Sequence, residues 1–271
     1  MSSDDNYKVK KYSPIRQILA DFNDEAARSP HIQGLLEVDV TEARNIIKEY
    51  EEKHNYRISL TGWVLYCIAN AVKEHERLNS FLKGSTKIII FENVDISVMI
   101  ERKTKEGKIV PYNHVVRKAE TKTVKEITDE VRISQEKELE DKDFIRGSSG
   151  ALVLYRFIPR FIRRYLMRKK LKNPFYLKKT AGTVGLTSLG PFVKTLSGWA
   201  VPLAIKTLNV ALGGIREKPA IVDGKIVKRE FLGVAYLINH NLVDGAPAAR
   251  FITHSIELME SASGLSEEDL K

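Results

Sequence analysis

A long hairpin in the last third of the chain is the feature that most limits the possible folds. Residues 208–240, LNVALGGIREKPAIVDGKIVKREFLGVAYLINH, place β-branched and apolar runs on both sides of Asp223 and Gly224. An Asp-Gly pair between two such runs is a strong signal for a tight turn, which predicts two antiparallel strands. The second run is apolar over 231–238, which predicts a buried strand. The fold must therefore contain a sheet in which this strand is covered.

Helical and strand patterns mix along the rest of the chain without a repeat. Apolar periodicity predicts helices over 13–30, 41–54, 59–75, 121–140 and 246–261, and a further helix that begins near Pro159. Strands are predicted over 31–40, 106–119 and 180–192, and as two short strands within 87–103. This mixture predicts an α/β fold, an α+β two-layer sandwich with a mixed sheet covered by helices. Since no linker of domain size interrupts it, we expect a single domain over residues 1–271, with a basic amphipathic insertion at about 146–172.

Composition sets broad limits on the location of the protein. A chain of 271 residues with 43% hydrophobic residues can bury a sizeable core. The polar N-terminus lacks the apolar core of a secretory signal, and no apolar run has the length of a membrane span. A single cysteine cannot form an internal disulfide, so we expect a cytoplasmic protein. That cysteine, Cys67, lies in the apolar run WVLYCIANAV, which predicts a packing role rather than a reactive thiol.

The net charge of +9 is unevenly distributed. No acidic residue occurs between Asp143 and Glu217, an interval that holds 14 lysines and arginines. The rest of the chain keeps 30 basic and 35 acidic residues and is therefore acidic. Such an uneven charge distribution is consistent with a surface for an anionic partner and equally with a solvated basic face.

The polar stretch NHNLVDGAPAARF, at 239–251, follows the predicted buried strand directly. It places His240 four residues before Asp244. A polar side chain at the end of a buried strand is costly unless it has a partner or a function. A neutral imidazole is a competent general base near pH 7, and a thiol is the nucleophile best matched to it. The alternative is a surface or core histidine without a catalytic role.

Small and hydroxyl-bearing residues could complete such a site. Gly245 directly follows Asp244 and would leave room for a ligand beside the strand end. The segment TVGLTSLG ends another predicted strand with the hydroxyl groups of Thr187 and Ser188.

Other kinds of site have little support in the sequence. The histidines do not cluster with cysteine or carboxylates at metal-binding spacing, so we expect no metal. Neither of the common glycine-rich phosphate-binding loops is present. Aromatic residues in the basic interval recur at helical spacing, which favours an apolar helix face over a base-stacking platform. We therefore do not expect a nucleic acid partner.

Taken in order, eight segments carry a resemblance to a known family. They are SPIRQILA, SPHIQGLLEVDVTEA, RLNSFL, NVDISVMI with GKIVP, GTVGLTSLG, ALGGIREKPAIVDGKIV and HNLVDGAPAARF. The chain resembles the catalytic domain of the dihydrolipoamide acyltransferases of 2-oxo acid dehydrogenase complexes, relatives of chloramphenicol acetyltransferase. The resemblance covers most of the chain outside roughly 136–180. It implies a chloramphenicol acetyltransferase-like fold.

The resemblance also implies roles for individual residues. His240 matches the general base that takes the thiol proton of coenzyme A or dihydrolipoamide, and the thiolate then attacks a thioester. Asp244 matches an aspartate that braces the site through an arginine, here Arg16. Thr187 falls where the family has an oxyanion-stabilising serine, and Ser188 lies where asparagine is usual. The family implies a homotrimer in which the histidine of one subunit faces the hydroxyl group of the next.

Departures from the family pattern leave alternatives open. The family's Asp and Arg beside the histidine are Asn239 and Asn241 here. Coenzyme A is expected as a substrate, with an acyl-lipoyl partner. No lipoyl attachment site is expected in this chain, because no lipoyl-domain hairpin surrounds Lys142. A non-catalytic trimeric scaffold is one alternative, and a peripheral binder of anionic surfaces is another.

The basic insertion bears on the second alternative. The predicted helix near Pro159 separates an apolar face from a basic face: Ile158, Phe161, Ile162 and Tyr165 on one, and Arg160, Arg163, Arg164 and Arg168 on the other. Such a helix can lie on an anionic membrane, or pack its apolar face on its own or a neighbouring subunit with the arginines solvated.

Overall fold

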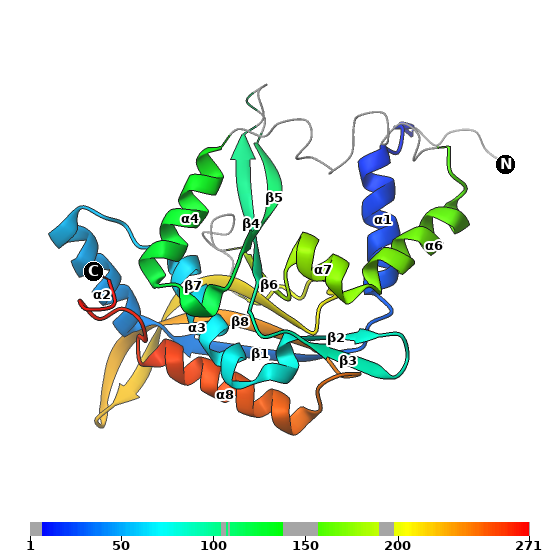
Figure 1. The fold of residues 1–271 in the computed structure, drawn as a ribbon. Coiled ribbons are helices and arrows are strands. Elements are labelled where there is room, and N and C mark those ends of the chain that lie inside the picture. Colours follow the sequence, from blue (N-terminus) through cyan, green and yellow to red (C-terminus); the bar gives the residue numbers. More distant parts are fainter. Residues whose placement is uncertain (1–6, 104–106, 108, 138–156, 190–197, 271) are drawn as a thin grey trace.

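The computed structural model describes residues 7–103, 107, 109–137, 157–189 and 198–270. A six-stranded sheet of order β1-β8-β7-β6-β4-β5 runs through the molecule, and β2 and β3 form a separate hairpin (Figure 1). β6 is parallel to both of its neighbours, and the other pairs are antiparallel. The strands are β1 (His31–Asp39), β2 (Ser80–Lys83), β3 (Lys87–Ile90), β4 (Ile96–Lys103), β5 (Ile109–Val116), β6 (Val184–Ser188), β7 (Leu208–Val222) and β8 (Lys225–Asn239).

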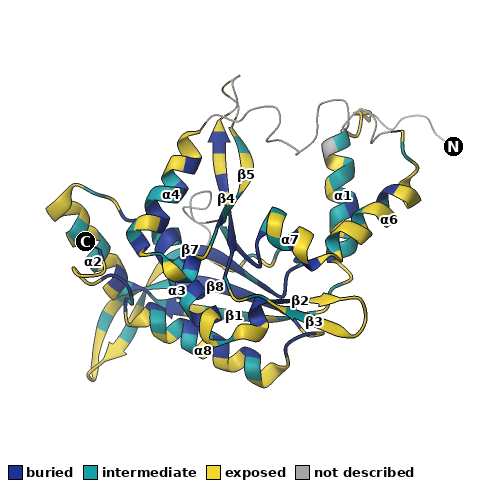
Figure 2. Ribbon diagram, viewed as in Figure 1, coloured by how far each residue is buried: buried dark blue, intermediate teal, exposed yellow. Residues whose placement is uncertain are grey.

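Helices cover one face of this sheet and confirm the predicted mixed sheet in two layers. α3 packs against both α4 and α8, while α4 packs on β4 and α8 on β1, and Figure 2 shows their inner sides buried. None of the described helices is both long and apolar enough to cross a membrane. The helices are α1 (Pro14–Ala26), α2 (Thr41–His54), α3 (Leu60–Glu74), α4 (Val124–Glu136), α6 (Arg160–Leu171), α7 (Pro174–Ala181) and α8 (Gly245–Glu260), with short 3-10 turns at Glu76–Asn79 and Ala119–Thr121.

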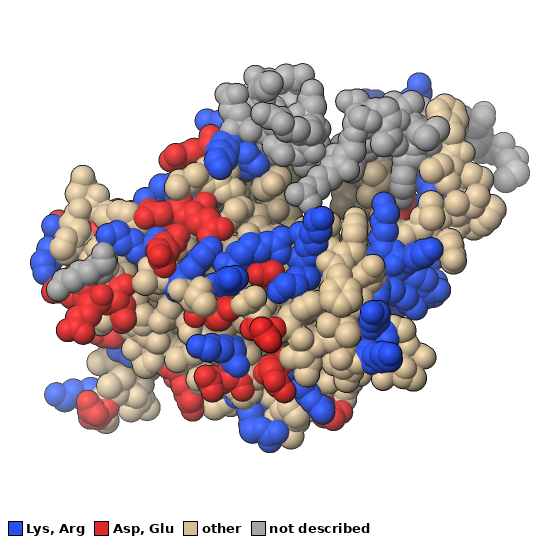
Figure 3. All heavy atoms as spheres, viewed as in Figure 1, with Lys and Arg blue, Asp and Glu red and all other residues tan. Residues whose placement is uncertain are grey.

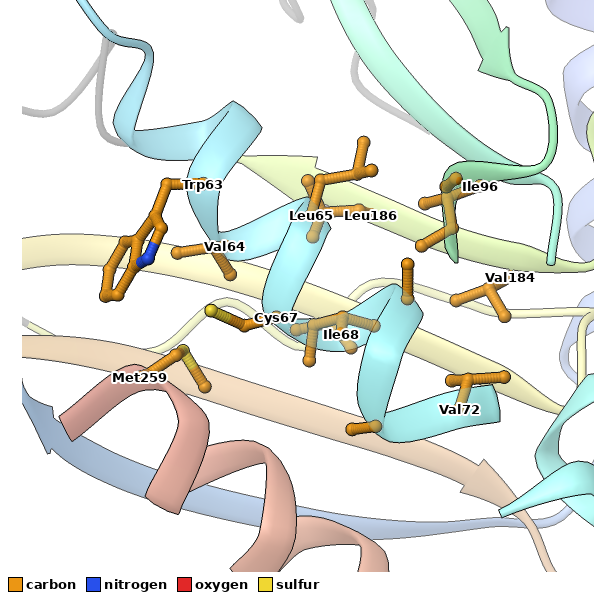
Figure 4. Close-up of a cluster of buried hydrophobic side chains, with 14 of the residues drawn as sticks. Trp63, Val64, Leu65, Cys67, Ile68, Val72, Ile96, Val184, Leu186 and Met259 are labelled. Carbon is orange, nitrogen blue, oxygen red and sulfur yellow. The ribbon is translucent and has the colours of Figure 1, made fainter. Parts of the chain in front are cut away.

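The core is centred on α3. Its first turn is capped by Ser59, whose side chain accepts a hydrogen bond from the Gly62 N–H. Apolar residues on nearly all sides then place the helix between the sheet and α8 (Figure 4). Cys67 is buried there as predicted, and burial raises the pKa of its thiol, which suits packing and not nucleophilic chemistry.

The predicted hairpin is confirmed as β7 and β8. Asp223 and Gly224 both have positive φ, as a two-residue turn of the primed type requires, and Val222 pairs with Lys225 beside them. Because side chains alternate along a strand, β8 supplies both faces of the sheet. One set joins the main core under the helices. The other set, on the opposite face, forms a small apolar cluster: Ala204, Ala211, Ala235 and Leu237. We call that side of the sheet the open face.

The basic insertion is described only from residue 157 onward, and the glycine-serine break at 147–150 and Lys142 lie outside the described residues. Within it, α6 lies beside α1 at the margin of the molecule (Figure 1). Figure 3 shows lysines and arginines gathered around α6 and α7.

The orientation of α6 contradicts the prediction that its apolar face packs on its own subunit with the arginines solvated. Its arginines pair with acidic side chains of α1: Arg160 with Asp24 at 3.1 Å, Arg163 with Asp21 at 3.4 Å and Arg168 with Glu25 at 3.1 Å. The apolar side chains point outward, and Phe161 is 74% exposed and Tyr165 65% exposed. The reason is that α1 offers acidic partners, so α6 turns its basic side toward them.

Candidate active site

The turn after β8 fixes the backbone of His240. Its N–H donates to the carbonyl of Pro30 at 2.9 Å. Asn239 organises the turn, since its side-chain oxygen accepts from the Asn241 N–H at 2.9 Å and its carbonyl accepts from the N–H groups of Leu242 and Val243. The imidazole of His240 is left 54% exposed. A rigid turn therefore presents an accessible imidazole at the end of a buried strand.

Asp244 occupies the N-cap position of α8, next to this imidazole. Its Oδ1 lies 4.0 Å from Nδ1 of His240, and its side chain is 79% exposed. Beside it, a Cβ added to Gly245 would meet nothing within 4 Å, so the space that the sequence predicted here is present.

The predicted buried pair between Asp244 and Arg16 does not form within one subunit. No ion pair joins the two residues in the part of the chain that the structure describes, and both side chains are exposed. The physical reason is the position of α1. Because the acidic residues of α1 bind the arginines of α6, the helix that carries Arg16 is held against α6 and not against the site.

Thr187 and Ser188 close β6 and point to opposite faces of the sheet. Thr187 pairs with Ala211, so its side chain lies on the open face. Ser188 pairs with Leu212, whose side chain belongs to the main core, and so faces the helices. Both residues are partly exposed.

One subunit does not bring Thr187 and His240 together. Thr187 aligns with Ala211, which aligns with Ala235 of β8, and His240 lies five positions beyond Ala235. With about 3.3 Å per residue along a strand and about 4.8 Å between strands, the two Cα atoms are roughly 19 Å apart. The two candidate groups therefore lie far apart in one subunit, and we call their surroundings the Thr187 half-site and the His240 half-site.

A lysine that the sequence did not single out lies near the Thr187 half-site. Lys206 is buried, and its Nζ donates to the carbonyl of Val184 at 3.0 Å and to Oγ of Ser97. Burial, with a smaller contribution from the charge of Arg117, lowers its pKa to about 7. The sequence feature that could have indicated Lys206 is its position as the one charged residue in the run VPLAIKTLNVAL at 201–212.

Comparison with known families defines the class of this protein. Residues 4–146 and 180–266 match the family described as 2-oxoacid dehydrogenases acyltransferase (catalytic domain). Because the match covers most of the chain, the protein belongs to this family, which confirms the resemblance inferred from its motifs. The segment 147–179, which contains α6, lies outside the match.

Individual relatives have low sequence identity to this chain, but they align with most of it. The succinyltransferase component of the 2-oxoglutarate dehydrogenase complex of Buchnera aphidicola is 26% identical over 79% of this chain and 42% of its own length. The acetyltransferase component of the pyruvate dehydrogenase complex of Bacillus subtilis is 24% identical over 92% of this chain and 49% of its own length. The chain thus spans about half the length of the curated relatives it matches.

Solved structures share the fold. A probable dihydrolipoamide acetyltransferase from Listeria monocytogenes superposes with a TM-score of 0.70 at 20% identity, over 95% of this chain and 96% of that one. The dihydrolipoamide acetyltransferase of Azotobacter vinelandii gives 0.70 at 18% identity, over 97% and 96%. The study of the latter concerns a serine, a histidine and an asparagine in its catalytic mechanism, with the asparagine four residues after the histidine.

Proposed function

We propose that the protein is an acyltransferase that moves an acyl group between coenzyme A and a thiol of the dihydrolipoamide type. The observation that carries this proposal is the imidazole of His240, held at the end of β8 and accessible to a substrate. The four-residue spacing of His240 and Asp244 equals that of the histidine and asparagine studied in the Azotobacter enzyme. Coenzyme A is a substrate in this proposal, and the acyl-lipoyl group belongs to a partner.

The reaction needs one base and one oxyanion donor. The imidazole of His240 takes the proton of the attacking thiol, and the thiolate forms a bond to the thioester carbonyl carbon. The carbonyl oxygen becomes an oxyanion, to which the hydroxyl group of Thr187 donates a hydrogen bond. As the carbonyl re-forms, the carbon–sulfur bond to the leaving thiolate breaks, and the imidazolium returns the proton to it. No proton is gained or lost overall.

The separation of the two half-sites supports a homotrimeric assembly with sites between subunits. An oxyanion donor must lie near 3 Å from the reacting oxygen, whereas Thr187 is roughly 19 Å from His240 in one subunit. A second copy therefore supplies the hydroxyl group in this proposal. Asp244, at 4.0 Å from the imidazole, steadies the imidazolium by its charge, and the open space at Gly245 admits the substrate. A reducing compartment such as the cytoplasm keeps the thiols available.

Asn239 argues against a non-catalytic scaffold. It replaces the family's aspartate, yet its side chain forms a hydrogen bond that shapes the catalytic turn. With asparagine in place of aspartate, the turn still holds the imidazole of His240 accessible at the end of β8.

The test is transfer from acetyl, succinyl and branched-chain acyl-coenzyme A to dihydrolipoamide by purified protein. Release of free coenzyme A and appearance of acyl-dihydrolipoamide are measured together. We expect transfer from at least one donor, and no transfer from any donor would overturn the proposal in favour of the scaffold.

A further inference from the structure

The amino group of Lys206 lies over Gly185 on the open face of the sheet. A Cβ built on Gly185 would stand 3.6 Å from Nζ of Lys206 and 2.3 Å from Oδ1 of Asn209. Any side chain at this position would collide with the Asn209 amide. The glycine therefore makes the room in which the lysine reaches its partners, Ser97 on β4 and the Val184 carbonyl on β6.

This position puts Lys206 in the Thr187 half-site. Gly185 and Thr187 are two residues apart on β6, so they face the same side of the sheet. Their Cα atoms are about 7 Å apart, which places the amino group roughly 10 Å from the Thr187 hydroxyl group. Across such a distance in a partly desolvated site, a charge still acts on a neighbouring charge.

The surroundings of Lys206 leave its charge unpaired. No carboxylate contacts Nζ within the described part of the chain, where its partners are a hydroxyl group and a carbonyl. Asp95, the acidic residue of this region, already pairs with Arg117 at 2.9 Å and with Lys178 at 3.2 Å. On the other side, the His31 ring lies 3.2 Å from the carbonyl oxygen of Lys206 and so contacts its backbone, away from the amine.

We propose that Lys206 is a positioning residue for acyl transfer, whose buried ammonium group supplies positive charge behind Thr187 and stabilises the oxyanion bound there. This inference rests on the proposed function and assigns to the chain a cation that its family motifs do not include. With a pKa of about 7, the lysine is poised between its two forms, and an anion on the open face favours the protonated form. The proton stays on the lysine throughout, so no bond to the substrate is involved.

The experiment is a pH profile of kcat/KM for wild-type protein, Lys206→Met and a control, Lys178→Met. In the wild type, kcat/KM should fall as the pH rises through about 7, because Lys206 loses its charge. Lys206→Met should lower kcat/KM about tenfold at pH 6 and remove this decline. Lys178→Met removes an amine from the same region but leaves Asp95 paired with Arg117, so it should keep the wild-type profile.

Stability separates this role from a structural one. Methionine is of similar size and removes a buried charge, so Lys206→Met should melt at or above the wild-type temperature. Lower melting with an unchanged profile would overturn the inference.

Ser97→Ala provides a second test if Lys206→Met does not fold. Loss of the hydroxyl acceptor disfavours the ammonium form, so the decline should move to lower pH, and an unmoved decline would count against Lys206. If the wild type transfers acyl groups but the Lys206→Met and Ser97→Ala results fail, the proposed function stands and the role of Lys206 is overturned. If the wild type transfers no acyl group, both the proposed function and the role of Lys206 are overturned.

Discussion

Nδ1 of His240 lies 4.0 Å from Oδ1 of Asp244, and both side chains are largely open to solvent. The distance is longer than a hydrogen bond, so the carboxylate acts on the imidazole through its charge. Within the described part of one subunit, no arginine pairs with Asp244, so the bracing that the family resemblance implied is absent there. The turn around Asn239 holds it instead.

Replacement of His240 by alanine should lower acyl transfer by about 10²–10⁴, the usual contribution of a general base. Because the side chain is 54% exposed, melting should stay close to the wild type. Asn241→Ala, a change at a neighbouring exposed position of the same turn, is the matched control and should retain activity. Full transfer by His240→Ala would show that the base is another group.

Asp244→Ala should change the free energy of unfolding by less than about 1 kcal/mol. The carboxylate is 79% exposed and makes no side-chain capping hydrogen bond to α8, so its removal leaves no buried charge unpaired. Urea denaturation measures this, with Arg16→Ala as the parallel variant. A loss of several kcal/mol in either variant would indicate that the two residues pair after all, in the assembled protein.

Asp21→Ala should release α1 from α6. The side chains of Asp21 and Arg163 are 1% and 10% exposed, and breaking such a pair by removing one partner costs about 3–5 kcal/mol. Because α1 packs mainly on α6, we expect faster proteolysis within Pro14–Ala26 and little change in the main melting transition. Asp24→Ala removes a more exposed partner of the same helix and should have a smaller effect. Equal resistance to proteolysis in the wild type, Asp21→Ala and Asp24→Ala would contradict this account.

The exposed side of α6 should contact a neighbouring subunit. Phe161→Glu and Tyr165→Glu should weaken assembly, as measured by dilution in light scattering, because they place charges in an apolar contact. Since the arginines of α6 are paired with α1, we expect no flotation with anionic vesicles at low salt. Salt-sensitive flotation that the same two changes abolish would favour a membrane surface instead.

A mass near three times 30.8 kDa is the expected size of the assembly. The apolar residues near the end of the chain are used within the subunit, since Leu265 and Leu270 are 2% and 1% exposed and Tyr50 donates to the Leu270 carbonyl at 3.1 Å. These residues are thus not free to join trimers into larger shells. A mass near twenty-four copies would refute the prediction.

Local signals predicted the parts of the fold that local chemistry determines. The Asp223-Gly224 turn and the apolar helix around Trp63 depend on residues adjacent in sequence, and both form where expected. Two short elements were missed, β2 and α7. The strand β2 has only four residues. The helix α7 begins at Pro174 with Asn173 as its N-cap, a start signal that the sequence analysis did not use.

Distant contacts explain the remaining differences. Which side of α6 faces inward depends on the acidic residues of α1, more than a hundred positions earlier. The environment of Lys206 depends on Ser97, which is 109 residues away in the sequence. The residues next to Lys206 in the sequence therefore could not reveal that environment. The motif series identified His240 and Thr187 as candidates, but the strand register separated them into two half-sites.

The pairing of β1 with β8 also determines when this chain can fold. Thr41, just after β1, bonds to Glu230 in β8, 189 residues later. During synthesis, the first strand of the sheet therefore waits for the last of the described strands, with its backbone groups unpaired. Closing so long a loop slows the formation of the sheet. Acquisition of the native sheet should thus follow the synthesis of β8, and β1 is the segment that chaperones would have to protect until β8 pairs with it.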